Sequence, residues 1–245
     1  MTPPEPPCLV CLPGLACDAT VWQPLLPALA GLAQPWVPPL AVHDSIGAMA
    51  DALLRDAPAE RFALAGHSLG GRIALEVMRR APQRVQRLAL LDTGWQPLPA
   101  GEAGERECAS RQTLVALARA KGMRAMGEQW VPGMLHPAHG GAAVYAEVLA
   151  MVERQAVERF AAQQQALMQR PDAADVLVAI NCPTLVLCGR EDGWSPLSRH
   201  EEMAARIRGA WLVVVAQCGH MSTMEQPQAV GKALAAWLQS GPATP

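Results

Sequence analysis

The chain has 245 residues, of which 51 % are hydrophobic and 17 % are charged, and its formal net charge is −2. This length and apolar content suit one large α/β domain with a sizeable core, and they do not fit an extensively disordered protein. The slightly negative charge argues against a nucleic-acid partner, which would require a basic surface. No apolar run approaches the roughly 18 residues that cross a membrane.

The seven cysteines form an odd number, and most of them lie in apolar runs such as "CLVCL" and "TLVLCG". Cys8 and Cys11 match C-x-x-C, but no second pair follows at the spacing of a zinc site. The N-terminal stretch also lacks the basic and apolar regions of a secretory signal. We therefore predict reduced, buried thiols in a cytoplasmic protein that needs no metal or organic cofactor.

Short apolar runs alternate with amphipathic stretches along most of the chain, which is typical of a parallel sheet with helical crossovers. The apolar runs predict strands that are buried on both faces. These strands are expected at residues 8–12, 35–39, 61–65, 86–91, 183–188 and 211–216. Helices are expected at 19–31, 45–57, 69–80, 197–207 and 226–239. In the second helix, Ser45 is a suitable N-cap.

The strand pattern is missing between Thr93 and Asp175. Helical pieces replace it at 105–121, 123–130, 141–153 and 155–169. An all-helical insertion after the fourth strand predicts a cap over one end of the sheet. We therefore expect an α/β core of residues 1–96 and 173–245 and a helical cap of residues 97–172.

One serine lies in a glycine-lined corner, "FALAGHSLGGRIALEV", where a predicted strand meets a predicted helix. The glycines on either side of Ser68 allow strand and helix to pass closely, and the turn exposes the hydroxyl above the sheet. Ser68 is therefore a candidate nucleophile. The alternative is that Ser68 only caps the helix that follows it.

A serine hydroxyl needs a base, and the base needs a carboxylate that orients it. Two later strands end in polar turns, "GREDGWSP" with Asp192 and "CGHMSTMEQP" with His220. Because the carboxyl ends of parallel strands meet at one edge of a sheet, these side chains are expected beside Ser68. Glu191 and, more seriously, Asp92 are alternative acids. His67 is expected to face away from Ser68 and to support the turn.

Acyl transfer also needs backbone N–H groups that stabilise the oxyanion. One donor is normally the residue after the nucleophile, here Leu69. The loop "CLPGLACDATVW" after the first strand offers Leu15 N–H as the second donor, since Gly14 permits a tight turn. Alternatively, this loop is an ordinary turn that opens a helix at Asp18.

Taken in order, "LPGLACDATVW", "GHSLGG", "GREDGWSP" and "CGHMSTMEQP" resemble the α/β-hydrolase superfamily across essentially the whole chain. The likeness is greatest to compact bacterial carboxylesterases with a small helical cap, such as the pimeloyl-ester carboxylesterase of biotin synthesis. The resemblance implies a catalytic Ser68, Asp192 and His220 and oxyanion donors Leu15 and Leu69. Two features depart from the family: a Pro-Gly pair replaces the usual His-Gly, and about six strands are expected instead of a larger sheet.

The cap is rich in Leu, Met and Ala, and we expect an apolar pocket lined by Trp95, Trp130 and Met134. Short- or medium-chain esters are the predicted small-molecule substrates. The same residues also fit a carbon–carbon bond, lactone or thioester hydrolase, or a non-catalytic ligand receptor. Three arginines either meet an anionic substrate or lie on solvated helix faces: Arg111, Arg119 and Arg124. The sequence leaves the oligomeric state open.

Overall fold

The computed structural model describes residues 6–39, 41–139 and 143–241. At its centre is a six-stranded sheet with the order β2-β1-β3-β4-β5-β6, and each neighbouring pair of strands is parallel. The strands are β1 (Cys8–Leu12), β2 (Gln34–Trp36), β3 (Phe62–His67), β4 (Val85–Leu91), β5 (Thr184–Gly189) and β6 (Trp211–Val215). All six predicted strands are confirmed, with small differences at their ends.

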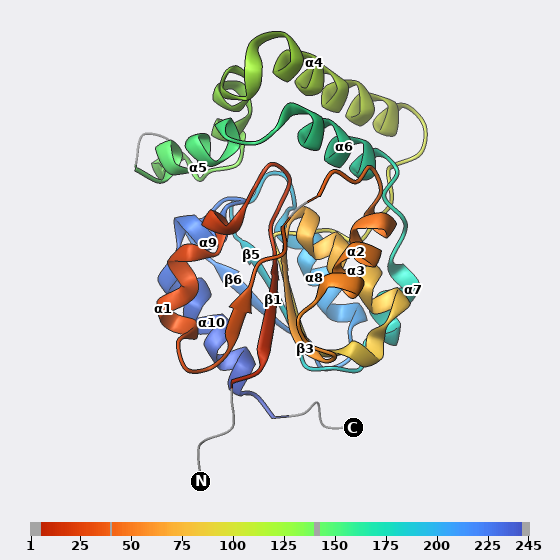
Figure 1. The fold of residues 1–245 in the computed structure, drawn as a ribbon, viewed down its shortest axis with the longest axis vertical. Coiled ribbons are helices and arrows are strands. Elements are labelled where there is room, and N and C mark those ends of the chain that lie inside the picture. Colours follow the sequence, from red (N-terminus) through yellow and green to blue (C-terminus); the bar gives the residue numbers. More distant parts are fainter. Residues whose placement is uncertain (1–5, 40, 140–142, 242–245) are drawn as a thin grey trace.

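Helices cover both faces of this sheet (Figure 1). The short α1 (Leu26–Leu29) contacts α10 (Pro227–Gln239) on one face. The other face carries α2 (Ile46–Asp56), α3 (Leu69–Arg80) and α8 (Leu197–Arg206). Two shorter helices, α7 (Ala174–Ala179) and α9 (Ser222–Glu225), complete this part of the fold. The chain thus has the predicted α/β architecture.

The prediction of one continuous helix at 19–31 is wrong. Two 3-10 turns, Ala19–Val21 and Gln23–Leu25, precede the four-residue α1. Pro24 and Pro27 each lie at the start of a new turn. Because proline has no N–H and its ring clashes with the preceding turn, each proline ends one hydrogen-bonded run and begins another.

Between β4 and β5 the chain forms α4 (Glu102–Trp130), α5 (Ala143–Glu153) and α6 (Val157–Met168). These helices contact one another and lie together over one end of the sheet (Figure 1). Gly122 interrupts α4 with φ 86° and ψ 166°, at the break expected from the sequence. The helical insertion after the fourth strand is therefore confirmed, while the exact division into core and cap stays a prediction.

The register of the sheet aligns the carboxyl ends of its strands. Leu12 is opposite Gly66, and His67 is opposite Leu91. The loops that leave these strand ends extend toward the helical insertion (Figure 1). Their meeting place is the edge at which open α/β sheets bind ligands. No helix in the described ranges is long and apolar enough to span a membrane.

Candidate active site

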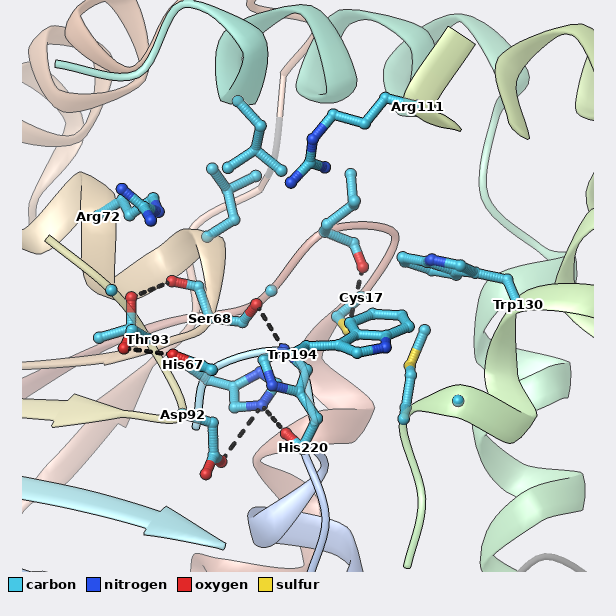
Figure 2. A pocket seen from close by; sticks show the side chains of 18 of the residues that line it. Cys17, His67, Ser68, Arg72, Asp92, Thr93, Arg111, Trp130, Trp194 and His220 are labelled. Atoms are coloured by element: carbon cyan, nitrogen blue, oxygen red, sulfur yellow. Dashed lines mark hydrogen bonds and ion pairs between the residues drawn. The ribbon is translucent and has the colours of Figure 1, made fainter. Parts of the chain in front are cut away.

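Ser68 occupies a strained turn between β3 and α3. Its backbone has φ 54° and ψ −114°, a left-handed conformation that is uncommon for any residue with a Cβ. Within the described residues, its side chain makes no capping bond to α3. The alternative of a simple N-cap therefore has no support in the structure. The strained turn instead presents the hydroxyl to the cavity above the sheet (Figure 2).

The glycines around this turn are required by close backbone contacts. A Cβ on Gly66 would lie 2.4 Å from the carbonyl oxygen of Gly70, and a Cβ on Gly70 would lie 2.2 Å from that of Leu12. Real Cβ atoms do not approach other atoms so closely. The "GHSLGG" stretch thus lets strand and helix pass at a separation that larger residues would prevent.

Ser68, His220 and Asp192 form a hydrogen-bonded row. The distance between His220 Nε2 and Ser68 Oγ is 2.9 Å, and that between His220 Nδ1 and Asp192 Oδ2 is 2.7 Å. The carboxylate can only accept, so His220 Nδ1–H donates to it, and the lone pair of Nε2 faces the serine hydroxyl. This is the geometry in which an imidazole can take the serine proton.

The surroundings of the row stabilise charge on the imidazole. Burial opposes a charged His220, but the nearby carboxylates, Asp192 foremost, together outweigh burial and raise the pKa of His220 above its ordinary value. Burial likewise opposes a charged Asp192, yet His220 and the N–H groups of Trp194 and Ser195 hold the pKa of Asp192 below its ordinary value. Those two N–H groups donate to Asp192 Oδ1 at 2.8 and 2.9 Å. Asp192 is therefore ionised and fixed in orientation at neutral pH.

The loop after β1 lies against the serine turn. A Cβ on Gly14 would lie 3.2 Å from Ser68 Cβ and 2.9 Å from His67 Nδ1. Leu15 and Leu69 both line the same cavity as Ser68. In the described part of the chain, neither Leu15 N–H nor Leu69 N–H has a hydrogen-bond acceptor. Both groups are thus available to an oxygen atom of a bound substrate.

The helical insertion holds this loop in place from the other side. Gln163 Oε1, on α6, accepts a hydrogen bond from Ala16 N–H at 3.0 Å. Asp18 caps the following 3-10 turn through Thr20 N–H, as its N-cap role predicts. Arg154 also donates to both carboxylate oxygens of Asp18, at 2.7 and 3.0 Å. The contacts of Gln163 and Arg154 with this loop could not be predicted from sequence, because they join segments more than a hundred residues apart.

Asp92, the alternative acid, does not contact the imidazole of His220. Its Oδ1 accepts a hydrogen bond from Gly189 N–H at 3.0 Å, and its Oδ2 pairs with the hydroxyl of Ser222. Burial, followed by the charge of Asp192, raises the pKa of Asp92 well above its usual range. Asp92 therefore supports the loops of β5 and α9 and is not the partner of the imidazole.

His67 also has a supporting position. Its Nε2–H donates to the carbonyl oxygen of His220 at 2.8 Å, and its ring is 1 % exposed. Burial lowers the pKa of His67 to about 4, so the ring is neutral at pH 7. His67 thus fixes the backbone that carries the candidate base, as a residue that supports the turn should.

Three supporting residues escaped the sequence analysis. Thr93 Oγ1 donates to the carbonyl oxygen of Ser68 at 2.6 Å, and Ser195 Oγ donates to the carbonyl oxygen of Thr93 at 2.6 Å.

Glu225 supports the loop that carries His220. Its Oε1 accepts from Gly219 N–H and Met221 N–H, on either side of His220. Its Oε2 accepts from His136 N–H and pairs with His139 Nδ1. Only Thr93 closely follows a strand end, so the sequence offered a signal for Thr93 but none for Ser195 or Glu225.

A cavity of about 580 Å³ opens above Ser68, between the sheet edge and the helical insertion. Trp130 and Met134 line it, and the rings of Trp130 and Trp194 lie tilted against each other, with centroids 5.1 Å apart. Trp95 does not line it, and this expectation is corrected. The ring of Trp95 instead lies under the guanidinium of Arg206, 4.4 Å from its centroid.

Contrary to the expectation from the sequence, the cavity is not purely apolar, because charged side chains also line it. Four arginines line the cavity: Arg72, Arg111, Arg170 and Arg199. Of the three arginines considered in the sequence analysis, only Arg111 lines the cavity. The side chains of Arg119 and Arg124 are each 58 % exposed and lie near Glu158 and Glu153, respectively. The period of a helix indicates which residues share a face, but the direction of that face depends on packing.

Comparison with known proteins agrees with this architecture. The model of the "Alpha/beta hydrolase family" matches residues 9–233. A Klebsiella pneumoniae protein provisionally named carbamate hydrolase RutD is 35 % identical over 190 residues, which cover 74 % of this chain and 68 % of that protein. A pimeloyl-[acyl-carrier protein] methyl ester esterase of Aromatoleum aromaticum is 27 % identical over 91 % of this chain and 94 % of its own length.

Among solved structures, a thermophilic esterase from Thermogutta terrifontis superposes with a TM-score of 0.84 and 27 % identity. The superposition covers 94 % of this chain and 89 % of that esterase. The sheet order, the helical insertion after β4 and the matched family model all lead to one assignment. The chain belongs to the alpha/beta hydrolase family and is a carboxylesterase-like hydrolase.

Proposed function

We propose that the chain is a serine hydrolase that cleaves carboxylic esters of short to medium length through an acyl-enzyme on Ser68. The observation that carries this proposal is the hydrogen-bonded row of Ser68, His220 and Asp192, with distances of 2.9 and 2.7 Å. The names of the similar proteins, a methyl ester esterase and an esterase, agree with the substrate class.

The reaction proceeds in two halves. His220 Nε2 takes the proton of Ser68 as the oxygen attacks the ester carbonyl, and the N–H groups of Leu15 and Leu69 stabilise the oxyanion. The intermediate collapses, the C–O bond to the alcohol breaks, and the imidazolium returns its proton to the leaving alkoxide. A water molecule, deprotonated by His220, then attacks the acyl-enzyme and releases the acid and the free serine.

The cavity limits the size of the substrate. Its volume of about 580 Å³ lies in the range of small-molecule sites, about 300–1,000 Å³. A small ester fits this space with both its acid and its alcohol parts. Long triglycerides do not, so we expect turnover to fall with increasing acyl length.

A fluorophosphonate probe tests the proposed nucleophile. We expect stoichiometric labelling of Ser68, with no labelling of a Ser68→Ala variant. A series of nitrophenyl esters of increasing acyl length then tests the reaction. Ligand binding without turnover would favour a receptor, and activity confined to ring-fission diketones would favour carbon–carbon bond hydrolysis.

The proposal includes a cytoplasmic location. All seven cysteines are free, among them Cys11, Cys17, Cys188 and Cys218 in the buried core. Burial raises the pKa of the Cys17 thiol to about 12, which keeps it protonated and unreactive. Alkylation of acid-quenched cells should find all seven thiols free, whereas recovery of disulfide-linked protein would contradict this location.

A further inference from the structure

The four arginines that line the cavity carry more positive charge than the surrounding carboxylates neutralise. Glu107 is the one carboxylate besides Asp92 among the described lining residues. It binds Arg170 through both oxygens, at 2.6 and 2.8 Å, and it also accepts from Arg111 Nε at 2.9 Å. One carboxylate is thus shared by two guanidinium groups.

Arg72 and Arg199 have no such partner. Arg72 Nη1 donates to the carbonyl oxygen of Gln96 at 2.9 Å, and Arg199 Nη1 donates to that of Trp194 at 3.3 Å. Across the described ranges, no carboxylate oxygen lies within 4.0 Å of either guanidinium. Each guanidinium carries five N–H donors, so most of these donors remain available to a ligand.

These two side chains also converge. A Cβ on Gly94 would lie 2.8 Å from Arg72 Nη2 and 3.3 Å from Arg199 Nη1. Both guanidinium groups therefore pack over the same glycine, on a wall of the cavity that contains Ser68. Burial, and then the charges of Arg170 and Arg199, lower the pKa of Arg72 to about 9. The protein thus holds like charges together, which costs stability unless an anion separates them.

The opposite wall has a different character. Figure 2 shows Arg72 on one side of Ser68 and the rings of Trp130 and Trp194 on the other, while Arg111 extends from the insertion above. The rings of Trp194 and His220 have centroids 5.2 Å apart, so the aromatic wall continues to the candidate base. A substrate that crosses Ser68 would therefore meet aromatic rings at one end and guanidinium groups at the other.

From this polarity we infer that the substrate is an ester bearing a carboxylate, which Arg72 and Arg199 bind while the reacting carbonyl lies at Ser68. A planar carboxylate matches the fork of a guanidinium and forms charge-assisted bonds with it. Half-esters of dicarboxylic acids belong to this class. The inference rests on the ester hydrolysis proposed above and names its substrate class.

Turnover of paired esters provides the first test. The kcat/KM for monomethyl glutarate and monomethyl adipate is compared with that for the dimethyl esters, by methanol release. We expect the wild-type protein to prefer the half-esters by at least about tenfold. Arg72→Met and Arg199→Met should each reduce this preference by about 10- to 100-fold, the range for hydrogen bonds to a charged group. Equal turnover of half-esters and diesters by the wild-type protein would overturn the inference.

Arg119→Met is the matched control, since Arg119 is an exposed arginine on the same helix as Arg111. We expect it to leave the half-ester preference unchanged. The melting temperature of each variant tests folding. Arg72→Met removes a positive charge that has no carboxylate partner. The carbonyl oxygen of Gln96, which loses its bond from Arg72, still accepts one from Arg170 Nε at 3.4 Å. Its melting temperature should therefore be no lower than that of the wild type, whereas a purely structural Arg72 would give a clear decrease.

A binding measurement separates this inference from the proposed reaction. Calorimetry with glutarate on the Ser68→Ala variant should detect binding that weakens with salt and is lost in Ser68→Ala/Arg72→Met. If glutarate shows this salt-sensitive, Arg72-dependent binding but no ester is hydrolysed, the proposed reaction is wrong and the anion site is supported. If Ser68-dependent hydrolysis of neutral esters occurs without glutarate binding, the anion site fails. Tighter binding of inorganic phosphate than of glutarate would overturn the assignment to a carboxylate.

Discussion

Gln163 Oε1 on α6 accepts a hydrogen bond from the backbone N–H of Ala16, next to Leu15 in the loop after β1. Ala16 has φ 54°, so this loop is strained and depends on outside contacts. The helical insertion thereby positions the residue that we propose as an oxyanion donor. Gln163 is a positioning residue in this arrangement, since it does not line the cavity over Ser68.

Replacement of Gln163 by Leu should lower kcat/KM for a nitrophenyl ester by about 10- to 100-fold. Outright loss of an oxyanion donor costs about 10²- to 10³-fold, and a loosened loop should cost less. The effect should fall on kcat more than on KM, because the oxyanion forms only in the transition state. Gln165→Leu, in the same helix, serves as the control. Equal kinetics for the two variants would refute a positioning role.

Asp192 and Asp92 lie near each other but differ in their contact with His220. Asp192→Asn should lower kcat by about 10⁴-fold, because the amide stabilises the wrong tautomer of the imidazole. Asp92→Asn should lower kcat by less than about tenfold, since an amide can still accept from Gly189 N–H and pair with Ser222. Steady-state kinetics of both variants test this, and comparable losses would contradict the assignment of Asp192.

The pH dependence of kcat/KM reports the protonation of His220. The imidazole can take the serine proton only when it is neutral, so activity falls as pH decreases through the pKa of His220. Asp192 raises this pKa above the ordinary value of 6.5, so the acid limb should lie above pH 6.5. In the residual activity of Asp192→Asn, the limb should shift to lower pH. A limb that stays in place in this variant would show that another group titrates.

The close contact of Gly70 with β1 can be tested by its effect on stability. A Cβ there would meet the backbone oxygen of Leu12, which cannot move without disturbing the sheet. Gly70→Ala should therefore lower the free energy of unfolding by about 1–3 kcal/mol, as other overpacked sites do. Gly193→Ala is the control, because a Cβ on Gly193 meets no atom within 4 Å. Urea denaturation of the two variants measures the difference.

Much of the fold follows from local pattern. Apolar runs fixed the positions of the strands, and Gly122 ended one helical piece of the insertion because its φ of 86° suits glycine. The motifs also placed Ser68, Asp192 and His220 at three strand ends. The continuous helix predicted at 19–31 was wrong because Pro24 and Pro27 lack the N–H groups that a continuous helix requires.

The lining of the cavity could not be predicted in the same way. Arg111 and Arg119 lie on one predicted helix, yet Arg111 faces the cavity and Arg119 is exposed to solvent. Trp95 lies in the same loop after β4 as Thr93, but it packs under Arg206 and does not line the cavity. Each outcome depends on how the insertion and the core lie against each other.

The sequence by itself determined the family and the order of its motifs, since both follow from short-range spacing that the backbone must obey. Tertiary structure decided which charges share a wall, which carboxylate contacts the imidazole and which side chains support the loops. These contacts join residues far apart in the chain, and small differences in packing direction decide whether a side chain reaches the cavity or the solvent.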